Sequence, residues 1–156
     1  MRIGLGIDVH PLVAGRPLIL GGVRIAADVG LAGHSDADVL THAVMDALLG
    51  AAALGDIGQY FPSGDPRYAG ADSLRLLERV LSLLEEHGFR PVQLDCTLLA
   101  EKPALAPYYH AMRQNLARVL HLPPEAVAIK ATTTEGLGFL GRGEGLAAVA
   151  LAVIAP

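Results

Sequence analysis

The stretch Gly33–Leu54 reads GHSDADVLTHAVMDALLGAAAL, a short polar segment followed by a long apolar one. Ser35 and Asp38 have the spacing of a capping box, in which side chains satisfy the free backbone N–H groups at the start of a helix. The apolar run that follows has the length of an ordinary globular helix. The stretch therefore predicts a helix over residues 37–54 with Ser35 as its N-cap.

Outward from this helix, hydrophobic spacing and turn residues predict five strands and two further helices. The predicted strands are residues 2–10, 16–25 (with a turn or bulge at Gly21-Gly22), 91–99, 127–133 and 146–154. The further helices are residues 72–87, capped by Asp72 or Ser73 and stopped by Gly88, and residues 107–120. Residues 26–33, 55–70 and 135–145 are predicted as loops. The second of these holds six Gly and Pro residues in sixteen positions, which is long for a simple connection and indicates a functional loop.

Composition indicates one globular domain over residues 1–156. Hydrophobic residues make up 52% of the chain and charged residues 18%, which excludes a disordered protein. The mixed order of strands and helices predicts an α+β fold: a single-domain, two-layer mixed sheet with its helices on one face. The apolar strands leave the other face of the sheet in need of cover, which we expect a second subunit to provide.

Charge and cysteine content narrow the class of partner. The net charge is −4 and no basic stripe is visible, so nucleic acid is not an expected partner. A single cysteine, Cys96, fits a reducing cytoplasm and a place as a small core residue. The first seven residues are too short for a signal peptide, and the apolar stretch 146–155 is half the length needed to span a bilayer. We expect a soluble, cytoplasmic protein without a membrane partner.

The first strand carries a candidate metal site. Alternate residues of a strand share a face, so the Asp8 and His10 side chains can reach one cation, and His42 can supply a third ligand from the predicted helix. Two histidines and a carboxylate are the ligands of many catalytic zinc sites. Asp46 lies four residues after His42, and we expect it to accept the second ring N–H of that histidine. The alternatives are an exposed strand-end histidine, a solvated stripe of Asp38, His42 and Asp46, and a non-haem iron site.

The segment Lys130–Gly145, KATTTEGLGFLGRGEG, is a candidate phosphate site at the end of a strand. Three consecutive threonine hydroxyls and flexible backbone N–H groups can donate to phosphate oxygens. Arg142 can pair with a phosphate, and Glu135 can hold a hard cation such as Mg²⁺. The start of the helix at residues 33–38 offers further donors to an anion. The alternative is ordinary turn chemistry, since Thr-rich strand ends and glycine-rich turns are common.

Taken together, these segments resemble the family of 2-C-methyl-D-erythritol 2,4-cyclodiphosphate synthases of the non-mevalonate isoprenoid pathway. The resemblance covers nearly the whole chain, and its specificity comes from the combination of motifs in order. These motifs are Gly6-Ile7-Asp8-Val9-His10, Gly33–Asp38 with His42, Asp56–Asp65, Ala100–Pro107 and Lys130–Gly145.

The resemblance implies an enzyme that cyclises 4-diphosphocytidyl-2-C-methyl-D-erythritol 2-phosphate to the 2,4-cyclodiphosphate and releases CMP. It also implies a homotrimer whose sheets face a threefold axis and whose active sites lie between subunits. The resemblance further implies that Asp8, His10 and His42 hold Zn²⁺ or a similar divalent ion. Glu135 would hold Mg²⁺ or Mn²⁺ with the substrate diphosphate, and His34 and Thr133 would support the transition state.

The same resemblance implies three groups of substrate contacts. Those around the erythritol and the phosphates are Asp8, His10, His34, Ser35, Asp56, Ile57, Gly58, Phe61, Pro62, Ser63, Gly64 and Asp65. Those around the cytidine nucleotide are Ala100, Glu101, Lys102, Pro103, Ala104, Leu105, Ala106, Thr132, Thr133, Thr134 and Glu135. Phe139 and Arg142 lie near an axial cavity that accommodates an isoprenoid diphosphate in the family. Relatives commonly have a basic residue where this chain has Ala104, so a side-chain contact from that position is in doubt.

Two other functions remain open at this point. One is a metal-dependent phosphohydrolase, which would give water-derived monophosphates instead of a cyclic product. The other is a non-catalytic trimer with a structural zinc ion and a cavity that senses a prenyl diphosphate. An open fourth coordination position would argue against this second alternative, because structural zinc sites are normally closed.

Overall fold

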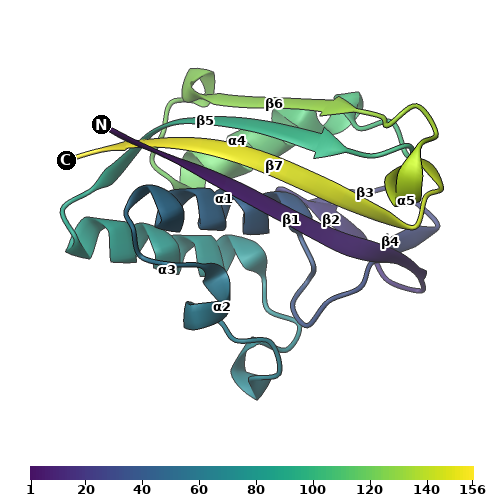
Figure 1. Ribbon diagram of the computed structural model, residues 1–156, viewed down its shortest axis with the longest axis horizontal. Helices are drawn as coiled ribbons and strands as arrows, with labels where there is room; N and C mark the ends of the chain where they lie inside the picture. Colours follow the sequence, from purple (N-terminus) through teal and green to yellow (C-terminus); the bar gives the residue numbers. More distant parts are fainter.

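A five-stranded mixed sheet forms one layer of the computed structural model, which describes residues 1–156 (Figure 1). The strand order is β4-β1-β7-β5-β6, with β5 and β6 parallel and the other neighbours antiparallel. The strands of this sheet are β1 (Arg2–Ala14), β4 (Val29–Leu31), β5 (Arg90–Leu99), β6 (Val127–Thr132) and β7 (Gly145–Ala155). Because Arg2–Pro11 of β1 pairs antiparallel with Gly145–Ile154 of β7, the two chain termini lie at the same end of the sheet (Figure 1).

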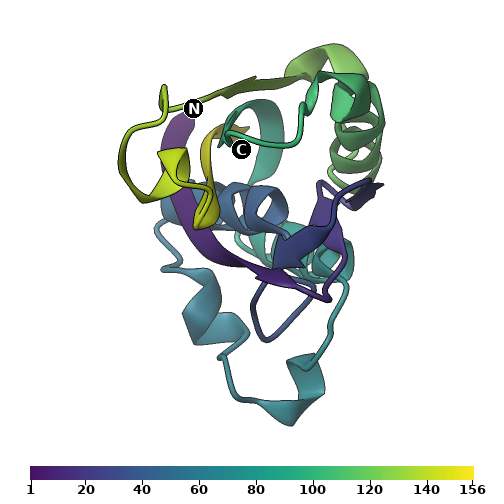
Figure 2. The same cartoon turned by 90° about the vertical axis from the view of Figure 1, so that its right-hand side faces the viewer.

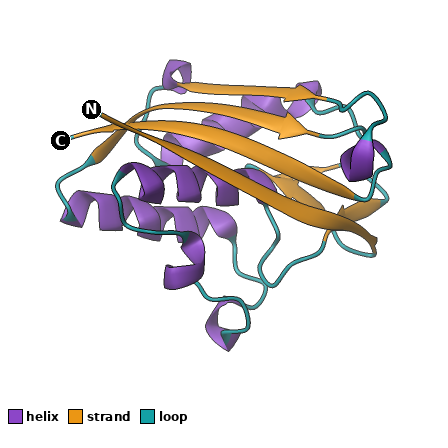
Figure 3. Cartoon of the chain, in the orientation of Figure 1, coloured by secondary structure: helices purple, strands orange, loops and turns teal.

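Three longer helices cover one face of this sheet (Figure 3). They are α1 (Val39–Ala51), α3 (Ser73–Glu86) and α4 (Tyr109–Val119). The helix α1 packs against β1 and β7, and α3 packs on α1. This arrangement confirms the predicted α+β fold with its helices on one side. None of the helices is both long and apolar enough to cross a membrane.

Two glycines bring α1 unusually close to β1. A Cβ atom at Gly4 would lie 2.0 Å from the carbonyl oxygen of Ala47, and one at Gly6 would lie 1.9 Å from that of Ala43. Such distances are possible only without side chains, so strand and helix meet backbone to backbone. The same face of β1 continues with Asp8 and therefore carries its side chain toward α1.

The opposite face of the sheet is apolar and bare. The large side chains of β1 that alternate with the glycines are exposed, by 68% for Ile3 and by 45–58% for the next three. The exposed side chains on this face are Ile3, Leu5, Ile7 and Val9 of β1 and Leu151 of β7. A single chain thus leaves uncovered the face that the sequence predicted to need cover.

Several predicted elements differ in extent. Residues 16–25 form a hairpin, β2 (Leu18–Leu20) and β3 (Val23–Ile25), and not one strand. Gly21 and Gly22 both have positive φ, at 55° and 70°, which is the conformation of a two-residue hairpin turn. Residues 26–33, predicted as a loop, contain β4, which pairs with the end of β1.

The N-cap of α1 is Asp38 and not Ser35, so the helix begins two residues later than predicted and ends at Ala51. The fully buried Asp38 carboxylate accepts the Thr41 backbone N–H at 3.0 Å, and the backbone N–H groups of Gly21 and Gly22 at 2.9 and 2.8 Å. Only the Thr41 donor belongs to the start of the helix, whereas the other two belong to the hairpin turn. Burial raises the pKa of Asp38, against the lowering effect of these donors.

The remaining predictions hold with small shifts. The second helix is capped by Asp72 and ends at Glu86, with His87 as its C-cap before Gly88 with φ 76°. The predicted loops also contain one-turn helices, which are too short to show a helical pattern in the sequence. These are α2 (Ile57–Tyr60), η1 (Pro66–Tyr68) and α5 (Gly138–Gly141), with η2 (Ala106–Tyr108) and η3 (Pro124–Ala126) next to α4 and β6. Cys96 is fully buried in the core, as predicted, and burial raises the pKa of its thiol to about 12.

Candidate metal centre and substrate pockets

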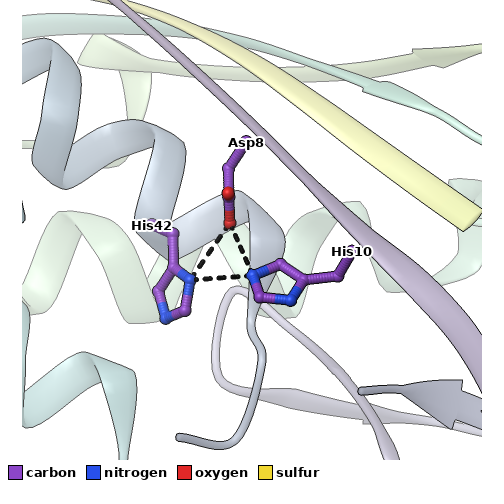
Figure 4. Close-up of side chains that lie close together, drawn as sticks. All are labelled: Asp8, His10 and His42. Carbon is purple, nitrogen blue, oxygen red and sulfur yellow. Dashed lines mark hydrogen bonds and ion pairs between the residues drawn. The ribbon is translucent and has the colours of Figure 1, made fainter. Parts of the chain in front are cut away.

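Three side chains from β1 and α1 converge on one point (Figure 4). The Oδ2 atom of Asp8 lies 2.9 Å from Nε2 of His10 and 3.1 Å from Nδ1 of His42. The two imidazole nitrogens are 3.3 Å apart. The strand alternation that predicted a shared face for Asp8 and His10 is therefore confirmed, and α1 brings His42 within reach.

The outer ring nitrogens of both histidines are engaged elsewhere. Nδ1 of His10 lies 2.7 Å from the carbonyl oxygen of Ala32, which can only accept a hydrogen bond, so this nitrogen carries the proton in the neutral ring. Nε2 of His42 lies 2.9 Å from Oγ of Ser73 and 3.2 Å from Oγ of Ser35. Nε2 of His10 is thus left with a lone pair that points to Asp8 and His42.

The spacing of these three atoms fits a metal ion. Ligands on a tetrahedral zinc ion with bonds of about 2.0–2.1 Å stand about 3.3–3.4 Å from one another. The observed separations of 2.9, 3.1 and 3.3 Å are close to that value. Asp8, His10 and His42 are therefore positioned to bind a divalent cation.

The electrostatics of the cluster favour an ionised carboxylate. Burial of Asp8 acts to raise its pKa, but the hydrogen bonds and charges of His10 and His42 outweigh this and lower it to about 2. The Asp8 carboxylate in turn raises the pKa of His10. A negative oxygen that is available at any physiological pH is what a hard or borderline cation requires.

The prediction that Asp46 accepts a hydrogen bond from His42 was wrong. Asp46 accepts the backbone N–H of Ile57 at 2.8 Å and makes no hydrogen bond to His42, whose outer nitrogen faces two serine hydroxyls instead. Residues four apart on α1 lie on one face, but the His42 ring turns toward α3 and not along its own helix. A solvated stripe on α1 is also excluded, because Asp38 and His42 are buried.

A pocket of about 240 Å³ opens beside the three ligands. It brings together many residues that the family resemblance named, with three more that it did not. The former are Asp8, His10, His34, Ser35, His42, Ile57, Gly58, Phe61 and Ser63, and the latter are Met45, Tyr68 and Leu76. The three additional residues carry no polar motif, so only the fold could reveal them.

The rim of this pocket is built by short polar contacts. Nε2 of His34 donates to the carbonyl oxygen of Asp65 at 2.7 Å and so joins two loops. The Asp56 carboxylate caps α2 through Gln59, and the Asp65 carboxylate caps η1. Asp56, Pro62, Gly64 and Asp65 belong to the same segment but do not line the pocket.

A second pocket, of about 330 Å³, lies at the C-terminal ends of β5 and β6. It is lined by most of the predicted cytidine contacts together with two neighbours that were not predicted. Its lining residues are Ala100, Glu101, Pro103, Ala104, Leu105, Ala106, Tyr109, Ala131, Thr132 and Thr133. Lys102 instead lines a third hollow, with Arg142, whose guanidinium pairs with Glu144 at 2.9 Å.

Glu101 holds the loop that follows β6. Its Oε1 atom accepts the backbone N–H groups of Thr134 at 2.9 Å and Gly136 at 3.3 Å, and these donors lower the pKa of the carboxyl. The Thr133 hydroxyl accepts the backbone N–H of Glu135 at 3.2 Å. Glu135 itself is exposed, with φ at 55°, and its carboxylate has no protein partner.

The two pockets of one chain are separate. They share no lining residue, and in both views the α2–η1 segment lies below the body while the loop after β6 lies at the end of the sheet (Figures 1 and 2). His34 and Thr133, which the resemblance assigned to one transition state, therefore lie in different pockets of a single chain.

The YgbB family model matches residues 1–155. The chain belongs to the YgbB family. A curated relative from Symbiobacterium thermophilum, 2-C-methyl-D-erythritol 2,4-cyclodiphosphate synthase, is 61% identical over 99% of both chains. This confirms the resemblance found in the sequence and the class of enzyme that it implied.

Solved structures place this YgbB-family chain in the same group. The fold matches a CDP-bound 2C-methyl-D-erythritol-2,4-cyclodiphosphate synthase with a TM-score of 0.90 and 38% identity, over 99% of this chain and 100% of the other. It also matches the bifunctional IspDF from Campylobacter jejuni with a TM-score of 0.95 and 42% identity. The latter match covers 98% of this chain and 42% of the longer protein.

Proposed function

We propose that this chain converts 4-diphosphocytidyl-2-C-methyl-D-erythritol 2-phosphate into 2-C-methyl-D-erythritol 2,4-cyclodiphosphate and CMP. An oxygen of the 2-phosphate attacks the β-phosphorus, and the new P–O bond closes the ring. The bond from the β-phosphorus to the bridging oxygen breaks, and its electron pair leaves with CMP. Because the nucleophile belongs to the substrate, the protein has to position groups and neutralise charge.

The observation that carries this proposal is the convergence of Asp8, His10 and His42 on the wall of a pocket. We assign these three residues to Zn²⁺ or a similar divalent ion. When bound, such an ion neutralises and polarises a phosphate oxygen. The three ligands come from the protein and face the pocket, as in catalytic zinc sites, whereas structural sites are closed by a fourth protein ligand.

The pocket beside these ligands suits the methylerythritol phosphate. The Nε2–H group of His34 donates a hydrogen bond to the carbonyl oxygen of Asp65, so Nδ1 remains available to the substrate. Gly58 offers bare backbone to a polyol, and Phe61 and Ile57 offer apolar surface to its methyl group. We assign Ser35, Asp56 and the segment 61–65 to the same part of the substrate.

The pocket at the ends of β5 and β6 suits the cytidine nucleotide. Ala100, Glu101, residues 103–106 and Thr132 form its walls, and Glu101 orders the loop that presents Thr133 and Thr134. The free carboxylate of Glu135 supports an assignment to Mg²⁺ or Mn²⁺ with the diphosphate, since both ions prefer oxygen ligands. Thr133, with His34, is assigned to stabilisation of the transition state.

In a homotrimer, the pocket beside the metal ligands of one subunit would meet the pocket at the ends of β5 and β6 of its neighbour. The bare apolar face of β1 and β7 is the surface that such an assembly would bury, and large apolar patches mark interaction sites. Two pockets that share no residue in one chain can meet across an interface between copies. We propose that each active site combines the metal ligands of one subunit with the cytidine pocket of its neighbour.

The reaction is tested with purified protein, the diphosphocytidyl substrate and both metal ions, followed by ³¹P NMR and nucleotide chromatography. We expect a cyclic diphosphate and CMP in equal amounts. His42→Ala should abolish both products while the trimer persists. Monophosphates formed from water would instead identify a phosphohydrolase, and full activity in protein shown to be free of metal would overturn the metal assignment.

A further inference from the structure

Ser73 is a buried polar residue for which helix formation gives no reason. It is the first residue of α3 and has no exposed surface, but the helix is capped by the neighbouring Asp72, whose side chain accepts the Leu74 backbone N–H. The Ser73 hydroxyl lies instead between the Asp36 carboxylate and the ring of His42. It therefore joins three segments: the loop before α1, α1 itself and α3.

The positions of the hydrogen atoms in the series of hydrogen bonds from Asp36 through Ser73 to His42 can be assigned from its two end residues. The Asp36 carboxylate can only accept, so the single hydroxyl hydrogen of Ser73 points to it. With that hydrogen committed, the Ser73 oxygen can only accept from His42, whose Nε2 atom lies 2.9 Å away. Nε2 of His42 therefore carries the proton of the neutral ring. The Asp8 carboxylate, 3.1 Å from Nδ1, would draw the proton to the other nitrogen, so the Ser73–Asp36 pair is what leaves Nδ1 with its lone pair.

The Asp36 carboxylate is itself firmly held. It accepts the backbone N–H of Ser73 at 2.9 Å and that of Asp38 at 3.1 Å. These two bonds fix its orientation, so the direction of the hydrogen bonds toward His42 is built into the backbone. The Ser35 hydroxyl, 3.2 Å from His42, has no carboxylate partner and does not impose a direction.

We propose that Ser73 and Asp36 are positioning residues of the metal centre: the chain Asp36–Ser73–His42 holds His42 in the tautomer that presents Nδ1 to the cation. This inference rests on the proposed metal site and extends it to two residues outside the ligand set. Partners that orient a metal-bound histidine typically change metal affinity by 10- to 100-fold when removed. Neither residue contacts the reacting atoms in this assignment.

The first test measures the tautomer in metal-free protein. The ¹⁵N shifts of the two ring nitrogens of His42 distinguish protonated from unprotonated nitrogen. In the parent chain we expect a proton on Nε2 alone, whereas Ser73→Ala should give a mixture of both tautomers. An unchanged tautomer in Ser73→Ala would overturn the proposal, and a merely structural role of Ser73 would leave these shifts unmoved.

The second test measures metal affinity by competition of Zn²⁺ and Co²⁺ with a chromophoric chelator. We expect Ser73→Ala to bind either ion 10- to 100-fold more weakly. Ser82→Ala, at a half-buried serine on the same helix, is the matched control and should bind like the parent. Equal affinity of Ser73→Ala and parent would contradict the proposal.

A second variant covers the case in which Ser73→Ala does not fold. In Asp36→Ala, the Ser73 hydroxyl loses its carboxylate acceptor, and its hydrogen is free to turn toward Nε2 of His42. We expect this variant to favour the proton on Nδ1 and to lose metal affinity in the same range. Parent protein that binds neither ion would refute the metal site itself, whereas binding by the parent with no effect of either variant would refute only the role of Ser73 and Asp36.

Discussion

At the scale of single residues, Arg16 holds the segment that carries His34 and Ser35. Its guanidinium donates to the carbonyl oxygens of Gly33 and Ser35, both at 2.8 Å, from the turn that precedes β2. A planar fork can bridge two carbonyls in a fixed geometry, which a single ammonium group cannot do. Arg16 thus fixes the backbone of a segment that lines the substrate pocket.

We expect Arg16→Met to lower kcat/KM by about 10- to 100-fold, because small displacements of positioning groups have large effects on rate. Arg16→Lys should fall between this variant and the parent. The measurement is steady-state CMP release, with Zn²⁺ affinity measured in parallel and expected to be no weaker than in the parent. The control is Arg24→Met, at an exposed arginine of β3. Parent-like kcat/KM in Arg16→Met would show that the loop holds its shape alone.

The sequence identified the three candidate metal ligands but not the residues that orient them. The ligands follow from local rules: Asp8 and His10 share a strand face, and His42 follows a polar helix start. The partner of His42 lies 31 residues away, on another helix. Spacing along one helix could only suggest Asp46, since no periodicity relates Ser73 to His42.

At the scale of elements, the contact between β1 and α1 sets the distance between Asp8 and His42. Gly4 and Gly6 allow the two backbones to touch, and the ligands follow along the same face of the strand. The sequence predicted both elements from their patterns. It did not predict how closely they pack, because a glycine in a strand is equally compatible with a bulge or a bend.

We expect Gly6→Ala to displace α1 from β1, because the new Cβ atom would lie 1.9 Å from a backbone oxygen that cannot turn away. The variant should lose on the order of 2–4 kcal/mol of unfolding free energy, the range of severe core overpacking, and bind Zn²⁺ more weakly. The control is Gly50→Ala, where nothing lies within 4 Å and alanine should stabilise α1 by up to about 1 kcal/mol. Denaturant unfolding of the metal-free proteins gives both values. Equal stability of Gly6→Ala and parent would contradict this account.

The loop after β6 is expected to depend on pH through Glu101. Its pKa is lowered in the folded loop, so its contribution to loop order is present above the ordinary carboxyl pKa and is lost as the pH falls through the lowered value. Amide hydrogen exchange of Thr134 and Gly136 should therefore accelerate, beyond its intrinsic pH dependence, only in the acid range. Glu101→Gln should show faster exchange already at neutral pH. Exchange at these two amides that is the same in Glu101→Gln and parent would show that other contacts order the loop.

At the scale of the whole molecule, the two faces of the sheet differ. The face covered by helices packs into the core and carries the candidate metal ligands of β1, while the opposite face is apolar and exposed. The sequence indicated this imbalance through its apolar strands, which left one face of the sheet in need of cover. It could not show from composition alone that the candidate metal ligands and the pocket at the ends of β5 and β6 lie apart in one chain. That separation depends on the order β4-β1-β7-β5-β6, which places strands distant in sequence side by side.

A shared active site predicts that two inactive variants restore each other. His42→Ala removes a candidate metal ligand, and Glu135→Ala removes the exposed carboxylate of the loop beside the second pocket, so each homotrimer should be inactive. In mixed trimers, some interfaces pair an intact metal centre with an intact cytidine pocket from the neighbouring subunit. In a closed ring of three, each mixed trimer has one intact site, so random assortment of equal amounts should restore about a quarter of the parent sites overall and about a third in the isolated mixed trimers. Co-expression with two different affinity tags isolates the mixed species for CMP-release assays. If each site lay within one chain, every chain would keep one defect and the mixture would stay inactive.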